Sequence, residues 1–550
     1  VMVFTTLLFL ESICLSASLP EVAAPVGRIR GISEGQVHVF RGIPYAEAPV
    51  GPLRWRPPKP IQPWQGVHDA SRYGSYCMSI KSKDVLIKGG SEDCLYLNVY
   101  APSEARRNMS LPCLVWIHGG SFETGSSNDY NATKLVNFWR SQQSYALVVT
   151  LNYRLNVFGF LGSDQLRARD DPSRSTGNYG MQDQRMALRW VQENIAAFGG
   201  DPEKVMLFGQ SAGAGSVSCH LAMPLSKGLY SGALMESGGF AGWSAQSMQQ
   251  KELWFGKLMN HSKCHTVECL AALPADELLS AYVAIPHGRC CEDMMAAPGI
   301  PWAPTIDGVE LSDHPLQLLK QQKVNHVPTV TGTTLDDGSR FFEQYNLSFT
   351  DFVTLFEEKY ESSRGQAELY RSESHISLPG YNDGWWSAER AVTDQNFFCP
   401  SHFAWQSLAA MGSPVFGYLF ASSSDSPIVH HFSEVPFLFM NLTENASLEE
   451  WHLAEEVAMS WYRFAASGHP GGHDRRWPHW PGWQSGEAPI LKFQVASKGG
   501  TQVIDGKQRD RQCTFMMEWI NRTLPDNVAS RGSVDIFSLP KGEEQEHLVV

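Results

Sequence analysis

The segment KVMLFGQSAGAGS, residues 204–216, decides how this chain folds. An apolar run ends at residue 208 and is followed at once by GQSAG (209–213), a G-x-S-x-G pattern in which small residues flank Ser211. A strand that turns sharply into a helix needs such residues, because their missing side chains let backbones approach one another. The pattern alone also suits an ordinary glycine-rich turn, so the surrounding segments must decide between the two interpretations.

Apolar runs of strand length stand on both sides of this segment, at LPCLVWI (111–117), YALVVTL (145–151), GALME (232–236) and VPTVTGTT (327–334). Continuously apolar strands are typical of sheets that are covered on both faces. Between the second run and the serine, residues 183–200 carry apolar side chains at helical spacing, from Asp183 to a Gly-Gly pair. Strand, crossover helix and strand predict a doubly wound α/β sheet, mostly parallel, with helices on both faces. Active sites of such sheets lie beyond the carboxyl ends of the strands, where Ser211 stands.

Composition indicates a large, well-buried protein. Of 550 residues, 43% are hydrophobic and only 18% are charged, and the formal net charge is −13. That balance disfavours nucleic acid as a partner, because phosphate recognition needs clustered Lys and Arg. No linker interrupts the chain, so we expect residues 19–550 to form one large domain with a polar tail from about residue 526. The looser pattern after about residue 240 predicts a lid or excursion on that domain.

The first 18 residues, VMVFTTLLFLESICLSAS, are apolar and end in small side chains, which predicts a secretory signal cleaved near Leu19. A short buried N-terminal helix is the alternative. No later run reaches the 18 or more apolar residues of a membrane span, so we expect no span and a secreted product.

Two features favour the secretory route. Asn-x-Ser/Thr sequons, candidate glycosylation sites, occur at Asn108, Asn131, Asn260, Asn346, Asn441, Asn445 and Asn521. Removing Cys14 with the signal leaves ten cysteines, an even number that suits an oxidising compartment. Spacing does not settle their pairing, and Cys113 and Cys219, inside apolar runs, also suit buried free thiols.

A serine hydroxyl needs a histidine to accept its proton, a carboxylate to orient that histidine, and N–H donors for the oxyanion. The run WIHGGSF (116–122) follows an apolar strand, and its flexible backbone suits the donor role. We expect an oxyanion hole made by the N–H groups of Gly120, Ser121 and Ala212. Alone, the glycine run is more often a plain turn; with the serine segment it indicates acyl transfer.

Four long stretches resemble the type B carboxylesterase/cholinesterase family of α/β hydrolases: FRGIPYAEAPVGPLRWRPP (40–58), SEDCLYLNVY (91–100), LNYRLNVFGFL (151–161) and GNYGMQDQRMALRWVQENIAAFGGDPEKVMLFGQSAG (177–213). The resemblance extends from about residue 26 to 525. It implies a cofactor-free enzyme without a catalytic metal, whose triad follows the chain order serine, acid, histidine.

The resemblance also implies which residues complete the triad. The family places its Glu just before Gly-Ser after a strand, and Asp337 stands there in TTLDDGSRFF (333–342), one methylene shorter; Asp336 is its neighbour and competitor. The His-x-x-Glu pattern in VHHFSEVPFLF (429–439) selects His431 over His430. We therefore expect a triad of Ser211, Asp337 and His431.

The same resemblance implies the pairing of the cysteines and two buried ion pairs. It joins Cys77 to Cys94, Cys264 to Cys269 and Cys399 to Cys513, and leaves Cys290 and Cys291 unassigned. It also pairs Arg41 with Glu92 and Arg154 with Asp183 as parts of the scaffold.

Around the triad, the sequence departs from the cholinesterases. The loop 77–94 has no aromatic residue and carries lysines, Gln210 replaces the acid before the serine, and Arg340 stands where cholinesterases carry an aromatic residue. We expect Glu123, beside the oxyanion loop, to offset part of the charge of Arg340, and Pro298 and Ile300 resemble the acyl-pocket positions that bulky aromatics fill in acetyl-selective relatives. The loop, Gln210 and Arg340 each oppose the binding of a cationic head group, and Pro298 and Ile300 imply a wider acyl pocket.

We therefore expect a small-molecule ester substrate, neutral or anionic, hydrolysed through an acyl-enzyme. A lipase or sterol esterase is the alternative within enzymes. A neuroligin-like adhesion protein is the non-catalytic alternative, which the serine at position 211 disfavours. The sequence leaves the oligomeric state open.

Overall fold

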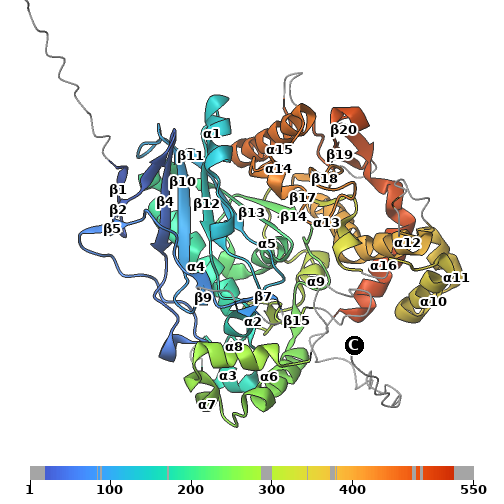
Figure 1. Cartoon of the computed structure of the whole chain (residues 1–550), viewed down its shortest axis with the longest axis horizontal. Coiled ribbons are helices and arrows are strands. Elements are labelled where there is room, and N and C mark those ends of the chain that lie inside the picture. The colour runs from blue at the N-terminus through green and yellow to red at the C-terminus, as the bar shows by residue number, and fades with distance from the viewer. Residues whose placement is uncertain are drawn as a thin grey trace, which may run out of the picture.

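The computed structural model describes residues 19–82, 85–86, 90–169, 173–286, 300–342, 345–371, 378, 381–472, 479–483 and 487–524 (Figure 1). Within this part of the chain, the central sheet has eleven strands in the order β20-β19-β18-β17-β14-β13-β11-β12-β10-β4-β3. Their bounds are β3 (Ile32–Glu34), β4 (Val37–Pro44), β10 (Tyr96–Pro102), β11 (Leu111–Ile117), β12 (Leu147–Leu151), β13 (Gly200–Gln210), β14 (Gly232–Glu236), β17 (Thr329–Thr334), β18 (Val415–Phe420), β19 (Pro489–Phe493) and β20 (Gln502–Asp505).

The central strands run parallel, from β12 through β11, β13, β14, β17 and β18 to β19, and antiparallel strands flank them. Each apolar run singled out from the sequence forms one of these strands, so the predicted α/β class is confirmed. The crossover helix is α4 (Tyr179–Asn194), which begins four residues before the predicted start at Asp183. That start was wrong because the Asp183 carboxylate lies inside the helix and binds Arg154 instead of capping the first turn.

Alternate side chains of β11 enter two different apolar cores, as a period of two requires. Leu114 and Trp116 pack with α1 (Thr133–Ser141), α14 (Val435–Leu438) and α15 (Leu448–Ser467). Val115 and Ile117 pack with α4, α5 (Ala212–Ala222) and α13 (Cys399–Ala410). Helices therefore cover both faces of the sheet.

The remaining elements lie around this core (Figure 1). The helices α6, α7 and α8 gather at one end of the molecule, and α10, α11, α12 and α16 lie beyond the β17–β19 side of the sheet. The bounds are β1 (Glu21–Ala24), β2 (Gly27–Arg30), β5 (Val67–Asp69), β6 (Tyr76–Cys77), β7 (Ile80–Ser82), β8 (Val85–Leu86), β9 (Gly90–Ser91), β15 (Gln246–Ser247), β16 (Thr305–Ile306), α2 (Asn156–Phe160), α3 (Asp164–Arg169), α6 (Met248–Ser262), α7 (Val267–Ala272), α8 (Ala275–Val283), α9 (Pro315–Lys320), α10 (Phe349–Tyr360), α11 (Arg364–Ala367), α12 (Asp383–Thr393) and α16 (Asp510–Thr523). In the part of the chain that the structure describes, every helix is too short or too polar to cross a bilayer.

Three disulfides have the pairing that the family resemblance implied: Cys77–Cys94, Cys264–Cys269 and Cys399–Cys513. Cys113 and Cys219 are buried free thiols, while Cys290 and Cys291 fall outside the described residues.

One of the two expected ion pairs is present. Arg154 Nη2 lies 2.7 Å from Asp183 Oδ1 in the core. The predicted ion pair between Arg41 and Glu92 was wrong. Arg41 forms an ion pair with Glu34, and Glu92 forms one with Arg54 at 2.5 Å. The antiparallel pairing of β3 with β4 brings Glu34 beside Arg41, a proximity that separation along the chain does not reveal.

Candidate active site

Ser211 occupies a sharp turn between β13 and α5. Its backbone has φ 58° and ψ −124°, a conformation that L-residues other than glycine seldom adopt. The Ser211 N–H donates to the Glu236 carbonyl of the adjacent strand β14 at 2.9 Å, which fixes the turn against the sheet. Such strain persists only where the surrounding structure imposes it, and it concentrates at functional sites.

The glycines of the GQSAG segment are required by packing. A Cβ atom on Gly213 would stand 2.0 Å from the Ile117 carbonyl oxygen of β11, and one on Gly209 would stand 2.6 Å from the same atom. Both distances are far below van der Waals contact, so neither position accommodates a side chain. The segment is therefore a built elbow and not a loose surface turn.

Asp337 follows β17 and begins the 3₁₀ turn Asp337–Arg340. Its side chain is completely buried; Oδ2 accepts the Thr334 N–H at 3.0 Å, and Oδ1 lies 2.6 Å from His431 Nδ1. Because a carboxylate only accepts, the histidine proton sits on Nδ1, and Nε2 is left as a base. The shorter Asp side chain therefore still reaches the histidine.

Asp336, the competitor for this role, is engaged elsewhere. Its Oδ1 binds Arg390 Nη2 at 2.7 Å, and its Oδ2 accepts the Val429 N–H at 2.9 Å. The second contact joins residues 336–340, the acid turn, to the segment that carries His431. Asp336 is thus a buried support and not the partner of the histidine.

His431 is 8% exposed and packs between aromatic side chains. The rings of Phe341 and Phe397 have centroids 5.1 and 4.8 Å from the imidazole. Gln210 Nε2 donates to His431 Nε2 at 3.2 Å, which places the elbow next to the histidine. The neighbouring His430 points elsewhere and binds the Ser339 and Ser426 hydroxyls.

The glycine turn after β11 lies against the elbow. Gly120, Ser121 and Phe122 have consecutive positive φ values of 104°, 57° and 60°. A Cβ on Gly120 would stand 2.3 Å from the Thr124 carbonyl oxygen, so only glycine fits there. A Cβ on Gly119 would stand 3.0 Å from the Ser211 Cβ, which shows how closely the two turns approach.

The expected substrate residues differ in their burial and in their contacts. Glu123 and Ile300 are buried, whereas Arg340 is exposed. Arg340 lies near His430, and its positive charge adds to the effect of burial in lowering the pKa of that histidine. Of the expected set, Gln210 is the residue in direct contact with His431. Pro298 lies outside the described residues.

Two further carboxyls, Glu236 and Glu434, are buried and interact with each other, and Glu434 also interacts with Asp337. Burial raises the pKa of Glu236 to about 8, against the opposing effect of a 2.7 Å hydrogen bond from Trp461 Nε1. Burial, followed by the negative charges of Glu236 and Asp337, raises the pKa of Glu434 well above its usual range. Both carboxyls therefore favour the neutral form at neutral pH, so they add little negative charge near Asp337.

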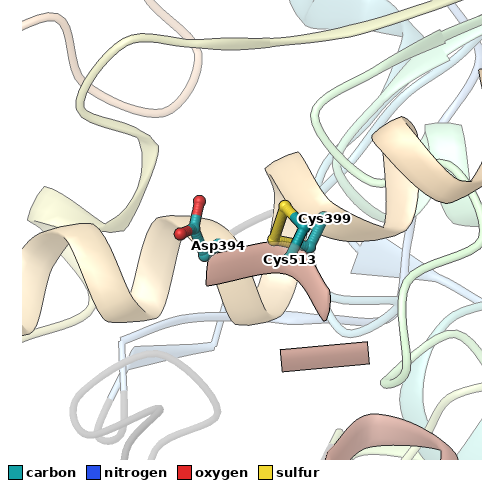
Figure 2. Close-up of side chains that lie close together, drawn as sticks. All are labelled: Asp394, Cys399 and Cys513. Carbon is teal, nitrogen blue, oxygen red and sulfur yellow. A yellow bond between two sulfur atoms is a disulfide. The ribbon is translucent and has the colours of Figure 1, made fainter. Parts of the chain in front are cut away.

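One group of metal-binding residue types occurs in the described part of the chain. Asp394, Cys399 and Cys513 bring their ligand atoms within 4.8 Å of one another. Figure 2 shows the two sulfurs bonded to each other, with the Asp394 carboxylate directed away from them. A disulfide offers no thiolate, and Asp394 already pairs with Arg509 at 2.9 Å, so this donor set does not suit a metal ion.

The sequence reasoning missed three residues around the site. Phe341 and Phe397 flank the histidine, and Arg390 holds Asp336. Phe341 stands four positions after Asp337, so its proximity to the acid was a usable signal. Phe397 and Arg390 reach the site from the distant segment 383–398 and have no local pattern.

Several known ester hydrolases are similar to this chain in sequence or in structure. A profile of the Carboxylesterase family matches residues 18–516. The para-nitrobenzyl esterase of Bacillus subtilis (strain 168) is 34% identical over 489 residues, covering 83% of this chain and 92% of the relative. The cholinesterase of Mus musculus is 31% identical over 551 residues, covering 92% and 87%. The structure is similar to that of a carboxylesterase from Geobacillus stearothermophilus, with a TM-score of 0.75 and 30% identity over 90% of this chain and 99% of the other.

Proposed function

Because the chain belongs to the carboxylesterase family and is a carboxylic ester hydrolase, we propose that Ser211 is its nucleophile, with His431 as general base and Asp337 as the orienting carboxylate. The observation that carries this proposal is the buried 2.6 Å contact between Asp337 and His431. It leaves the other imidazole nitrogen free of a proton and facing the strained elbow.

In the proposed reaction, Ser211 Oγ attacks the ester carbonyl carbon and His431 Nε2 accepts the hydroxyl proton. The N–H groups of Gly120, Ser121 and Ala212 stabilise the oxyanion. His431 then returns the proton to the departing alcohol, and an acyl-enzyme remains. Water, deprotonated by the same histidine, releases the carboxylic acid and restores the serine.

Gln210 must give way during this cycle. Its amide occupies His431 Nε2, the atom that accepts the serine proton. Contacts of this kind rearrange when substrate binds, since catalytic hydrogen bonds are often incomplete without it. Substrate binding therefore exchanges the amide contact for a contact with Ser211 Oγ.

The proposed substrates are neutral or anionic esters, not choline esters. The side chain before the nucleophile is a neutral amide, so it offers no charge to a quaternary ammonium. Arg340 adds positive charge near the acid turn, and the loop closed by Cys77 and Cys94 contains no aromatic face for cation–π binding.

The enzyme is proposed to be secreted. Three disulfides suit an oxidising compartment. Six of the seven sequon asparagines are exposed, and Asn521 is half-buried with its side chain near Gln317. The predicted signal, residues 1–18, lies outside the described part of the chain.

The first experiment compares initial rates of 4-nitrophenyl butyrate hydrolysis by the wild type, Ser211→Ala, His431→Ala and His430→Ala. We expect Ser211→Ala and His431→Ala to lose about 10⁴-fold or more in kcat, and His430→Ala to lose less than about tenfold. Butyrylthiocholine is the matched cationic substrate, and we expect a much lower kcat/KM for it. An active Ser211→Ala variant would refute the assignment of the nucleophile.

A further inference from the structure

A chain of buried polar side chains leads to the Ser211 elbow, and the proposed reaction does not use it. Four completely buried side chains form this polar chain: Gln184 of α4, Ser216 and His220 of α5, and Ser226 of the 3₁₀ turn after α5. Buried polar groups are unfavourable unless they are hydrogen-bonded, and these four bind one another. The polar chain therefore connects α4, α5 and the turn that follows α5.

The direction of the hydrogen bonds is fixed at His220. The Gln184 Oε1 atom only accepts, so His220 Nε2 carries the proton and donates to it at 3.0 Å. Burial, followed by the positive charge of Arg185, lowers the pKa of His220 to about 3, so the imidazole is neutral. Its Nδ1 is then an acceptor, and the Ser226 hydroxyl donates to it at 2.9 Å. These contacts orient the Gln184 amide with its NH2 group toward α5.

The polar chain ends at the first turn of α5. Gln184 Nε2 donates to Ser216 Oγ at 3.0 Å, and the Ser216 hydroxyl donates to the Ala212 carbonyl at 2.9 Å. A hydroxyl that binds the carbonyl four residues earlier changes the local direction of a helix. The Gly215 N–H donates to the Ser211 carbonyl at 2.9 Å, so Ser211 is bound into the same turn. The last link of the polar chain therefore acts on the turn that carries Ser211.

This first turn determines where two proposed reacting groups lie. Ser211 is the residue that flanks the start of α5, and the Ala212 N–H is the proposed oxyanion donor next to it. The backbone of Ser211 is held from the side of the sheet by the Glu236 carbonyl. The polar chain holds the same turn from the side of α4. A fully satisfied buried network specifies one arrangement, which apolar side chains of equal volume would not do.

We propose that Gln184 and Ser216 are positioning residues that hold the first turn of α5, and with it Ser211 and the Ala212 N–H, in the arrangement that ester attack requires. This inference rests on the proposed function of the Ser211 centre. Loss of either residue lets the turn shift, and a shift of about 1 Å in a reacting group reduces turnover about 10²-fold. Acylation and deacylation use the same groups, so both steps slow together and KM stays near its wild-type value.

The test measures kcat and KM for 4-nitrophenyl butyrate with the wild type, Ser216→Ala, Gln184→Met and Ser218→Ala. Ser218 is the matched control, because it is completely buried on the same helix and its hydroxyl donates to the Gly215 carbonyl at 2.8 Å instead of joining the polar chain. We expect Ser216→Ala and Gln184→Met to lower kcat about tenfold or more with KM within about threefold, and Ser218→Ala to keep kcat within about twofold.

The double variant of Ser216→Ala and Gln184→Met distinguishes one connected chain from two independent contacts. Effects within one hydrogen-bond network are not additive, so we expect the double variant to lose no more kcat than the more damaging single variant, within about threefold. Losses that multiply would overturn the proposal, because Gln184 would then not act through Ser216.

Urea unfolding and amide hydrogen exchange of residues 211–216 give readouts that do not depend on activity. Ser216→Ala and Ser218→Ala each remove one buried hydroxyl contact, so we expect similar urea midpoints. Lower kcat and faster exchange in Ser216→Ala than in Ser218→Ala support the proposal. Equal kcat or equal exchange in these two variants overturns it.

If Gln184→Met fails to fold, Ser216→Ala decides alone, because it removes only the last link of the polar chain. Ser211→Ala in the same assay separates this inference from the proposed function. An active Ser211→Ala refutes the proposed function. An inactive Ser211→Ala beside a Ser216→Ala with wild-type kcat overturns the positioning role alone.

Discussion

Adjacent residues of the acid turn have opposite tasks. Asp337 contacts His431, whereas Asp336 binds Arg390 and the backbone of the histidine segment. Both carboxylates are completely buried, so exposure does not distinguish them. Only their hydrogen-bond partners distinguish Asp337, which contacts the proposed base His431, from Asp336, which holds the turn.

This division predicts opposite phenotypes for two isosteric substitutions. In Asp337→Asn the amide oxygen would accept the Thr334 N–H and the amide NH2 would face His431 Nδ1, which favours the wrong histidine tautomer, so we expect kcat to fall about 10³- to 10⁴-fold. Asp336→Asn leaves the Arg390 guanidinium without that carboxylate partner, so we expect the free energy of unfolding to fall by about 3 kcal/mol with kcat within about tenfold. Steady-state kinetics and urea unfolding on both variants check the pair, and a catalytic loss in Asp336→Asn alone would reverse the assignment.

Ser121 offers a second test at this scale. Its φ of 57° disfavours a side chain, and its proposed role uses only the backbone N–H. We therefore expect Ser121→Gly to keep kcat/KM for 4-nitrophenyl butyrate within about threefold, in contrast to the hundredfold or greater loss when an oxyanion donor is removed. A loss of that larger size would show that the hydroxyl takes part.

At the residue scale, the sequence identifies those positions that belong to compact patterns. The elbow and the His-x-x-Glu register single out Ser211 and His431, and the structure brings their segments together through Gln210. Phe397 was not predictable, since it reaches the imidazole from a π-helical turn far along the chain. Arg390 likewise depends on tertiary packing that no local spacing encodes.

At the scale of single elements, the junction of β13 and α5 is the most constrained. Its helix starts directly under the end of β11, so the first turn of α5 has no room for a side chain at Gly213. The position of Ser211, the proposed nucleophile, thus depends on close contact between backbone atoms of neighbouring elements.

Gly213→Ala and Gly256→Ala form a matched pair that isolates this constraint. Alanine at position 213 would place Cβ 2.0 Å from the Ile117 oxygen, so we expect a loss of at least about 3 kcal/mol in unfolding free energy and a marked loss of kcat. Gly256 lies inside α6 with open space around it, so alanine there should stabilise by about 0.5 to 1 kcal/mol. Denaturant unfolding measures both, and equal effects would contradict the steric account.

Prediction of the elements succeeded where hydrophobic periodicity is strong. The apolar runs form β11, β12, β13, β14 and β17, and all five pair in parallel as expected. The start of α4 was misjudged because Asp183 resembles a cap in sequence, whereas its carboxylate serves Arg154. The predicted ion pair between Arg41 and Glu92 was wrong for the same reason. The partner of a long charged side chain depends on which residues the folded structure brings close to it.

At the scale of the whole molecule, buried carboxyls link stability to pH. The pKa of Glu236 rises from its usual 4.5 to about 8 on folding. The folded protein therefore keeps a proton that the unfolded chain releases. The contribution of Glu236 to stability is complete below about pH 4.5 and is lost as the pH rises through about 8.

Glu236→Gln removes this titration and keeps an acceptor for Trp461. We expect the variant to gain stability relative to the wild type as the pH rises from about 5 to 8, by a difference on the order of 3 kcal/mol. Urea unfolding at both pH values measures it. A difference between variant and wild type that is independent of pH would show that Glu236 titrates normally in the folded state.

The disulfide Cys399–Cys513 closes a covalent ring that contains His431 but neither Ser211 nor Asp337. A protease that cuts the backbone once anywhere between these two cysteines leaves both fragments tethered through sulfur. Nicked enzyme would therefore migrate on a gel as one intact chain until a reductant separates the pieces. His431, the proposed base, would also stay attached to the part of the molecule that carries Ser211, wherever between Cys399 and Cys513 the nick falls.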